Sequence, residues 1–467
     1  MVDITTDCDL KLINEKISSL ITYSEENHDC NNKLEIMCPD SLSESIFKIS
    51  PVEMHFQKLQ KIYAIENFVN RSDDIEPFFI ADQSILRSQH QKWTQHLPRF
   101  TPFYAVKSNN HELILKSLIN LGTSFDCASM EEIRTILDLG IPSEKIIFAN
   151  PCKSPIHLKY ASLKRISKMT FDNADELYKI KDYYPEAELV IRIDVDDSKS
   201  ICQFGVKFGV RLGKTKPLLE LAIKLGLKVI GISFHVGSGC TDASAFGDAI
   251  KRARLVFDEG KQLGFEFTLL DIGGGFPGPI AVHDGVSIQF EQIAETVNKT
   301  FDEYFGDIQD NLQLIAEPGR YFSSSAFTLV SNITSRRTVE TEEEVSYMYY
   351  INDGVYGSFN CIIYDHVTVP QPGSLIKKSN GQVSYKNLQE QQDDTFSSSI
   401  WGPTCDSMDC VSKSMRLPKL SCGDWLIFEN MGAYTLVAAS RFNGMSIPKV
   451  YYFDSMSSSI MANYETH

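Results

Sequence analysis

Short apolar runs recur through the middle of the chain, and each ends in a polar residue or glycine and precedes a stretch with helical periodicity. Eight strands alternating with helices over roughly 220 residues are typical of a closed, TIM-like (β/α)8 barrel. The rival architecture, an open doubly wound sheet, places its glycine-rich turn after the first strand, whereas here that turn follows the seventh run. The eight expected strands lie at 103–106, 124–128, 145–150, 168–172, 188–193, 228–236, 268–275 and 313–319.

The pattern changes after Arg320. Apolar runs at 326–334, 345–353, 424–432 and 449–454 are separated by turn residues without long helical stretches. This predicts a mainly β C-terminal domain, a modified barrel or sandwich, and the isolated run at 78–82 is expected to add a strand to its sheet. We expect a disordered tail over 1–45, an N-terminal segment over 46–100, the barrel over 101–325 and the β domain over 326–467, with an exposed or mobile loop insertion around 366–397.

Composition narrows the classes of partner. The chain has 467 residues, and 45 Lys and Arg against 61 Asp and Glu give a net charge of −16. Such a charge repels phosphate backbones and anionic lipid surfaces, so we expect neither nucleic acid nor a membrane as partner. A cationic small molecule is the more natural ligand.

The eleven cysteines show neither a Cys-x-x-Cys pair nor a zinc-like spacing, so we expect reduced thiols and no metal. The N-terminus lacks the basic flank and apolar stretch of a secretory signal, and no window approaches the roughly 18 continuous apolar residues of a membrane span. These features predict a cytoplasmic protein.

A barrel of this type carries its chemistry at the C-terminal ends of its strands. Glycine turns after strand seven together with Arg320 after strand eight suggest a phosphate site. Lys107, among apolar neighbours expected to lower its pKa, suits a Schiff base with an aldehyde, and Glu317 is placed to keep a ring nitrogen protonated. The sequence therefore suggests pyridoxal phosphate. The residues that follow the runs are Lys107, Asp126, Asn150, Asp172, Arg192, His235, Gly273–Gly275, Glu317 and Arg320.

Longer motifs extend these single residues: PFYAVKSN, FDCAS, FANPCK, SFHVGSG, DIGGGFPG, AEPGRYF, NDGVYGSFNCIIYDH and WGPTCDSMDC. Together they resemble the eukaryotic ornithine decarboxylase family over roughly residues 75 to 455. The resemblance implies a pyridoxal-phosphate barrel of the alanine racemase type joined to a β domain. It also implies a homodimer with active sites at the subunit interface, acting as a carboxy-lyase that converts L-ornithine to putrescine and CO2 in polyamine biosynthesis.

The resemblance assigns cofactor contacts residue by residue. Lys107 matches the lysine that binds the cofactor aldehyde, Glu317 the carboxylate at the pyridine nitrogen, and His235 the imidazole stacked on the ring. Asp126 and Arg192 match residues that line the cofactor pocket. The expected phosphate contacts are Ser238, Gly275, Gly319, Arg320 and Tyr434.

The same resemblance assigns substrate and interface residues. Asp365 and Asp406, with Tyr364 adjacent, match the residues that bind the distal ammonium of ornithine. Asp406 and Cys405 would come from the other subunit, and Cys405 would govern the return of a proton to the α-carbon. Lys207 and Asp409 match a pair across the dimer interface, and antizyme is a candidate regulatory partner.

Two alternatives remain open. A non-catalytic relative resembling antizyme inhibitor would share the fold, but such relatives lose several positions that match residues present here. A decarboxylase of lysine, arginine or diaminopimelate would share the cofactor machinery and differ in the distal pocket, where one methylene is worth only about 1–3 kcal/mol. The retained positions are Asp126, Arg192, Ser238, Tyr356 and Tyr434.

Overall fold

The computed structural model describes most of the chain after residue 50. Residues 59–467 form one compact unit, and the first described element is helix α2 (Pro51–Arg71). The tail expected over 1–45 lies outside the described residues. The structure describes residues 51–71, 76–278, 281–283, 286–342, 344–366, 370–379, 382–388, 395–454 and 459–461.

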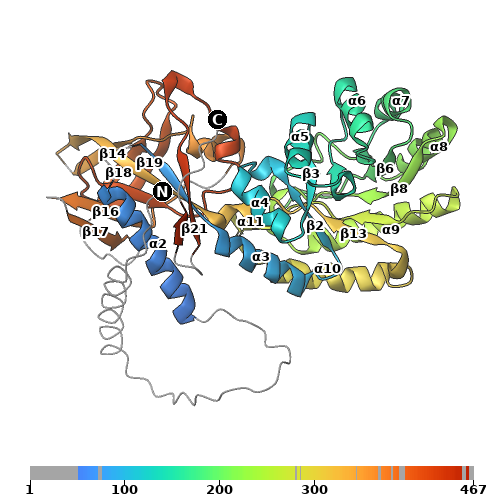
Figure 1. Cartoon of the computed structure of the whole chain (residues 1–467), viewed down its shortest axis with the longest axis horizontal. Helices are drawn as coiled ribbons and strands as arrows, with labels where there is room; N and C mark the ends of the chain where they lie inside the picture. The colour runs from blue at the N-terminus through green and yellow to red at the C-terminus, as the bar shows by residue number, and fades with distance from the viewer. Residues whose placement is uncertain are drawn as a thin grey trace, which may run out of the picture. The chain divides into compact units, whose positions relative to one another are not determined.

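Eight parallel strands close into a barrel in the cyan-to-yellow part of Figure 1, which confirms the predicted (β/α)8 architecture. Around the barrel the strand order is β10-β13-β2-β3-β4-β5-β6-β8. Each strand falls within or beside one of the eight apolar runs, because strands buried on both faces read as continuous apolar segments. The strands are β2 (Thr101–Ala105), β3 (Ser124–Cys127), β4 (Ile146–Phe148), β5 (Lys168–Phe171), β6 (Glu188–Arg192), β8 (Lys228–Ser233), β10 (Leu269–Asp271) and β13 (Gln313–Ala316).

Local signals define the ends of the helices between these strands. The side chain of Ser129 accepts from the Glu132 amide at 3.2 Å, and Asn173 accepts from the Glu176 amide at 2.9 Å; each satisfies a free donor of a first turn. The helices of this region are α3 (Gln83–His96), α4 (Glu112–Asn120), α5 (Met130–Asp138), α6 (Pro155–Lys164), α7 (Ala174–Tyr183), α8 (Thr215–Leu225), α9 (Ser244–Gln262), α10 (Phe290–Phe305) and α11 (Arg320–Ser323).

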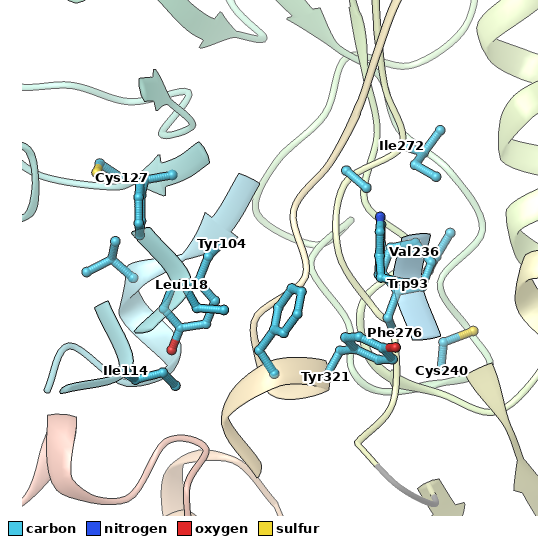
Figure 2. Close-up of a cluster of buried hydrophobic side chains, with 14 of the residues drawn as sticks. Trp93, Tyr104, Ile114, Leu118, Cys127, Val236, Cys240, Ile272, Phe276 and Tyr321 are labelled. Atoms are coloured by element: carbon cyan, nitrogen blue, oxygen red, sulfur yellow. The ribbon is translucent and has the colours of Figure 1, made fainter. Parts of the chain in front are cut away.

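The barrel is packed in two layers. Six strands each contribute one buried side chain to a small separate cluster, while a larger cluster joins the strands and helices of the barrel and continues into the β domain. Figure 2 shows part of the larger cluster, where the ring of Trp93 lies 4.9 Å from Phe276 and 5.4 Å from Tyr321, both edge-on. The interior cluster is Phe103, Ile147, Val190, Ile230, Leu269 and Ile315.

The β domain is built on a ten-stranded sheet whose main path runs β17-β16-β20-β14-β1-β21-β22. Strand β1 pairs antiparallel with β14 and parallel with β21, so the isolated N-terminal run joins this sheet as predicted. The strands are β1 (Phe78–Asp82), β14 (Phe327–Glu340), β15 (Val345–Ile351), β16 (Ser374–Ser379), β17 (Gln382–Asn387), β18 (Thr395–Trp401), β19 (Cys410–Pro418), β20 (Trp425–Phe428), β21 (Lys449–Asp454) and β22 (Ser459–Met461).

The expected loop around 366–397 is wrong over much of its length. Strands β16 and β17 form an antiparallel pair, and β16 also pairs with β20. Leu375 and Ile376 are fully buried, so this segment belongs to the domain's core. The two short strands could not be recognised in the sequence because clusters of turn residues flank them. In addition, β17 lies at the sheet edge and carries mostly polar side chains.

Candidate active site

Lys107 lies just beyond β2, in a short 3-10 turn at the C-terminal end of the barrel. Its Nζ donates to Oδ2 of Asp126, the aspartate of β3. The Lys107 side chain is 37% exposed, whereas Asp126 is fully buried and its Oδ1 has no hydrogen-bond partner among the described residues. The structure therefore brings the predicted reactive amine beside a buried carboxylate that retains one free acceptor.

The expected lowering of the Lys107 pKa is wrong in direction. Burial does act to lower the pKa of this amine, but the negative charges of Asp126 and Glu317 outweigh burial and raise it. Burial in turn raises the pKa of Asp126, against the opposing effects of Lys107 and Arg192. The amine is thus held as a cation by its carboxylate neighbours.

Glu317 follows β13 and is 7% exposed. Burial raises its pKa well above the ordinary value, and the charges of Asp271 and Asp126 raise it further. Arg192, at the end of β6, has its pKa lowered by burial while Glu317 and Asp172 act against that change. Glu317 therefore stands in a buried acidic group that makes its carboxyl easier to protonate than an ordinary glutamate.

His235 follows β8 and faces the glycine turn after β10. Its Nδ1 accepts from the Gly237 amide at 3.0 Å, and its ring meets Phe204 edge-on at 4.9 Å. Burial, followed by the charges of Arg192 and Lys107, lowers the pKa of His235 well below its ordinary value. The ring is therefore neutral, and because Nδ1 accepts, its proton resides on Nε2.

The turn itself admits no side chain at its centre. A Cβ on Gly274 would lie 2.7 Å from Nε2 of His235 and 2.9 Å from the carbonyl oxygen of Glu317. Gly275 follows in the left-handed region at φ +100°. His235 and the backbone of Glu317 thus lie directly against the backbone of Gly274. A turn without side chains leaves its backbone N–H groups accessible, as an anion-binding glycine turn requires.

Arg320 lies at the start of α11, directly after Gly319. Its Nη2 donates to both carboxylate oxygens of Asp365 at 2.6 Å and to Oγ of Ser238 at 3.1 Å. Its guanidinium carbon lies 5.0 Å from the ring centroid of Tyr434. Four of the predicted phosphate residues, Ser238, Gly319, Arg320 and Tyr434, therefore lie together, with the predicted substrate aspartate beside them.

Tyr434 is held in place by a residue that the sequence interpretation missed. Its backbone has a positive φ of 54°, and its amide donates to the carbonyl oxygen of Ser108 at 2.8 Å. Oγ of Ser108 lies 2.7 Å from Oγ of Ser323. Because Ser108 is the neighbour of Lys107, it ties the β domain to the reactive lysine. Its position directly after Lys107 was the only sequence signal.

Asp406, the other predicted substrate aspartate, is held by hydrogen bonds of its own. Oδ2 of Asp406 accepts from the Tyr356 hydroxyl, and Oδ1 accepts from the Met408 amide at 2.9 Å. Cys405 is exposed, and Tyr364 is 70% exposed. Within the described chain these residues show no contact with Lys107 or Glu317.

Lys207 and Asp409 do not meet within the described chain. Lys207 is exposed, with Nζ 5.0 Å from the ring centroid of Phe208. Asp409 is 1% exposed, and its carboxylate accepts from the amides of Val355 and Thr404, both at 2.9 Å. Asp409 thus joins two loops of one chain, and its pairing with Lys207 across a dimer remains a prediction.

A family model for the pyridoxal binding domain of pyridoxal-dependent decarboxylases matches residues 83–324. The chain belongs to the pyridoxal-dependent decarboxylase family. Ornithine decarboxylase of Rattus norvegicus is 46% identical over 412 residues, which is 86% of each chain. That of Schizosaccharomyces pombe is 46% identical over 384 residues, covering 82% of this chain and 84% of its own. Antizyme inhibitor 2 of Xenopus laevis is 45% identical over 419 residues, 88% of each.

Solved structures of decarboxylases share the fold. The Paramecium bursaria Chlorella virus arginine decarboxylase, bound to agmatine, superposes with a TM-score of 0.76 at 32% identity, covering 84% of this chain and 100% of that one. The lysine/ornithine decarboxylase of Vibrio vulnificus, complexed with cadaverine, gives 0.72 at 28% identity, with 84% and 98% covered. The relatives thus span several named basic substrates.

The described residues of this decarboxylase fit pyridoxal phosphate. Lys107 would supply an amine for the aldehyde, and the side-chain-free Gly274 and Gly275 with Arg320 would supply donors for the phosphate. The unpartnered Oδ1 of buried Asp126 leaves an acceptor for a polar group of a ligand. No group of three or more His, Cys, Asp or Glu in the described part of the chain is arranged to hold a metal ion.

Proposed function

We propose that this protein decarboxylates L-ornithine to putrescine and CO2 with pyridoxal phosphate, the first committed step of polyamine biosynthesis. The observation that carries the proposal is the contact between Lys107 and Asp126 at the mouth that also holds Glu317, His235 and Arg320. Relatives named ornithine decarboxylase, similar over most of both chains, support ornithine as the substrate.

The chain's own residues divide the work. Bound pyridoxal phosphate supplies an aldehyde that captures an amine and a ring that accepts the electrons left when the carboxylate departs. Asp126 orients the Lys107 amine and is placed to take the proton that this ammonium must lose before its nitrogen can bond to an aldehyde. Burial and two acidic neighbours raise the pKa of Glu317, so its carboxyl takes up a proton more readily than an exposed glutamate and is placed to share that proton with a ring nitrogen. Neutral His235 offers an uncharged ring face to an aromatic ligand.

Recognition of the substrate falls to carboxylates. The distal ammonium of ornithine needs a negative partner, and Asp365 and Asp406 are our candidates. Burial raises the pKa of Asp365, against the opposing charge of Arg320, whereas hydrogen bonds from the Met408 amide and Tyr356 lower that of Asp406. Asp406 is thus the carboxylate that stays ionised at lower pH.

We also propose a homodimer in which Cys405 and Asp406 complete the partner's site. Their lack of contact with Lys107, together with the exposure of Met408 at 66% and of Tyr364 at 70%, supports this arrangement. Mixing Lys107→Ala and Asp406→Ala chains tests it. Random pairing leaves one intact site in half of the dimers, so roughly a quarter of wild-type activity should return. No recovery after confirmed subunit exchange would refute shared sites.

The decisive experiment is steady-state CO2 release from ornithine, lysine, arginine and diaminopimelate by the purified protein with pyridoxal phosphate. We expect ornithine to have the highest kcat/KM. A higher value for another substrate would reassign the enzyme within its family. Binding of the cofactor without turnover of any of the four would favour a non-catalytic role, which the similarity to antizyme inhibitor 2 makes the second candidate.

For location we propose the cytoplasm. The eight described cysteines are free thiols, as expected in a reducing compartment. None of the described helices is long and apolar enough to cross a membrane. Antizyme remains a candidate partner, and a pull-down with purified antizyme tests whether it binds.

A further inference from the structure

We propose that Asp271 is the positioning residue that fixes Glu317 and the glycine turn relative to each other, an inference that rests on the proposed function. Asp271 is the last residue of β10 and is fully buried. In the motif DIGGGFPG the expected phosphate contact is a glycine that follows this carboxylate, and Asp271 itself has no expected role.

The backbone of Gly273 links the two parts of the site. Its amide donates to Oδ1 of Asp271 at 2.9 Å, and its carbonyl oxygen accepts from the Glu317 amide at 2.7 Å. Gly273 has φ +61°, and a Cβ there would lie 2.0 Å from the carbonyl oxygen of Phe234. The turn therefore has little freedom, and the Asp271 carboxylate holds it at the position that also receives Glu317.

The second oxygen of Asp271 gives this residue an electrostatic role as well. Oδ2 is buried and accepts from no N–H or hydroxyl group of the described residues, and the Asp271 and Glu317 carboxyls lie close enough to share a proton. Burial raises the pKa of Asp271 to about 7, and its negative charge in turn raises that of Glu317. Asp271 thus helps to keep a proton on the Glu317 carboxyl.

Charged groups from every neighbouring strand enter this balance. Negative charge comes from Asp126 of β3 and from Glu317 after β13. Positive charge comes from Lys107 after β2 and from Arg192 of β6, and Asp172 after β5 acts on Arg192. From β8, Ser233 and neutral His235 add none. The carboxyls of this group outnumber its two cations, so the site carries excess negative charge, which a proton on Glu317 lessens.

Two substitutions separate geometry from charge. Asp271→Asn keeps an Oδ1 acceptor for the Gly273 amide but removes the charge, whereas Asp271→Ala removes both. We expect Asn to retain the wild-type dissociation constant for pyridoxal phosphate within about threefold and Ala to weaken it at least tenfold. In Asp271→Asn the pH at which the cofactor's visible absorbance and kcat titrate should fall by about one unit or more, because Glu317 loses a negative neighbour.

The matched control is Asp424→Asn, a buried aspartate of the β domain whose carboxylate accepts from the Ser421 amide at 2.8 Å. It should change neither the cofactor's affinity nor the pH profile. If Asp271→Ala fails to fold, Asp271→Asn alone decides. Wild-type cofactor affinity and an unshifted pH profile in every folded Asp271 variant would overturn the proposal. The absorbance titration needs no ornithine turnover, so an inactive wild-type protein that still binds the cofactor would refute the proposed function separately.

Discussion

Nη2 of Arg320 lies 2.6 Å from both carboxylate oxygens of Asp365, in a pair whose side chains are only 18% and 7% exposed. The arginine is our candidate for the cofactor phosphate and the aspartate our candidate for the substrate ammonium. One ion pair therefore joins the two binding sites. A ligand that binds to Arg320 or to Asp365 changes the electrostatic potential at the other residue. Each ligand therefore changes the binding free energy of the other by the same amount.

Asp365→Asn tests this coupling. The variant loses the charge that faces the substrate, so we expect KM for ornithine to rise at least tenfold, in line with roughly 1.5–3 kcal/mol for a hydrogen bond to a charged group. The same change frees Arg320, so pyridoxal phosphate should bind as tightly or more tightly. Fluorescence titration of the cofactor and steady-state kinetics measure the two effects. Weaker cofactor binding would show that Asp365 supports Arg320 rather than competing for it.

Lys107 can be tested with a matched pair of variants. Lys107→Ala should abolish the visible absorbance of the Schiff base and reduce turnover at least a thousandfold, because the variant lacks the amine that forms the bond. Lys107→Arg should be equally inactive, yet more stable than Lys107→Ala, because a guanidinium still neutralises buried Asp126. Absorbance spectra, CO2 release and urea unfolding give the three readouts. Turnover retained by either variant would refute the assignment.

Whether a strand could be predicted from the sequence depended on how deeply its side chains are buried. The barrel strands could be predicted because burial on both faces makes each a continuous apolar run, as in Glu188–Arg192. Strand β17 could not, because it lies at the sheet edge and its residues, QVSYKN, are mostly polar. The sequence of such a segment is typical of a turn or loop, and its extended conformation becomes evident only from its hydrogen-bonded pairing with β16.

The residues of the candidate site likewise fall into those that the sequence predicts and those that only the tertiary fold brings together. Residues that end strands, such as Lys107 and Glu317, could be located because strand ends converge on one mouth of the barrel. The pair of Arg320 with Asp365 could not be predicted, because its members are 45 positions apart and meet only through the tertiary fold. The direction of the Lys107 pKa shift could not be predicted either, because burial lowers this pKa while two carboxylates raise it.

Asp406 provides a test of the distal site. Asp406→Ala should lower kcat/KM for ornithine at least tenfold, because the substrate's ammonium loses a carboxylate partner. Tyr356→Phe removes only the hydroxyl that donates to Asp406, so its effect should be smaller, within about 0.5–1.5 kcal/mol for one hydrogen bond. Cofactor affinity should not change in either variant. An unchanged kcat/KM in Asp406→Ala would remove this residue from the site.

Asp353 gives a prediction for stability against pH. This fully buried aspartate accepts from the Gly354 and Ser358 amides at 2.8 and 2.9 Å, and burial raises its pKa to about 6. Because the folded state holds the proton more tightly than the unfolded state, this group favours folding most at low pH. That contribution is lost as pH rises from about 4 through 6.

Asp353→Asn cannot ionise, so its stability should depend less on pH. It keeps an Oδ1 acceptor for both amides, so the fold should survive. Relative to wild type, its free energy of unfolding should improve by about 2 kcal/mol between pH 4.5 and pH 8, since each pKa unit is worth about 1.4 kcal/mol and part of the change already lies below pH 4.5. Urea unfolding at the two pH values measures this difference. Parallel pH curves for the two proteins would show that Asp353 is ionised in the fold throughout this range.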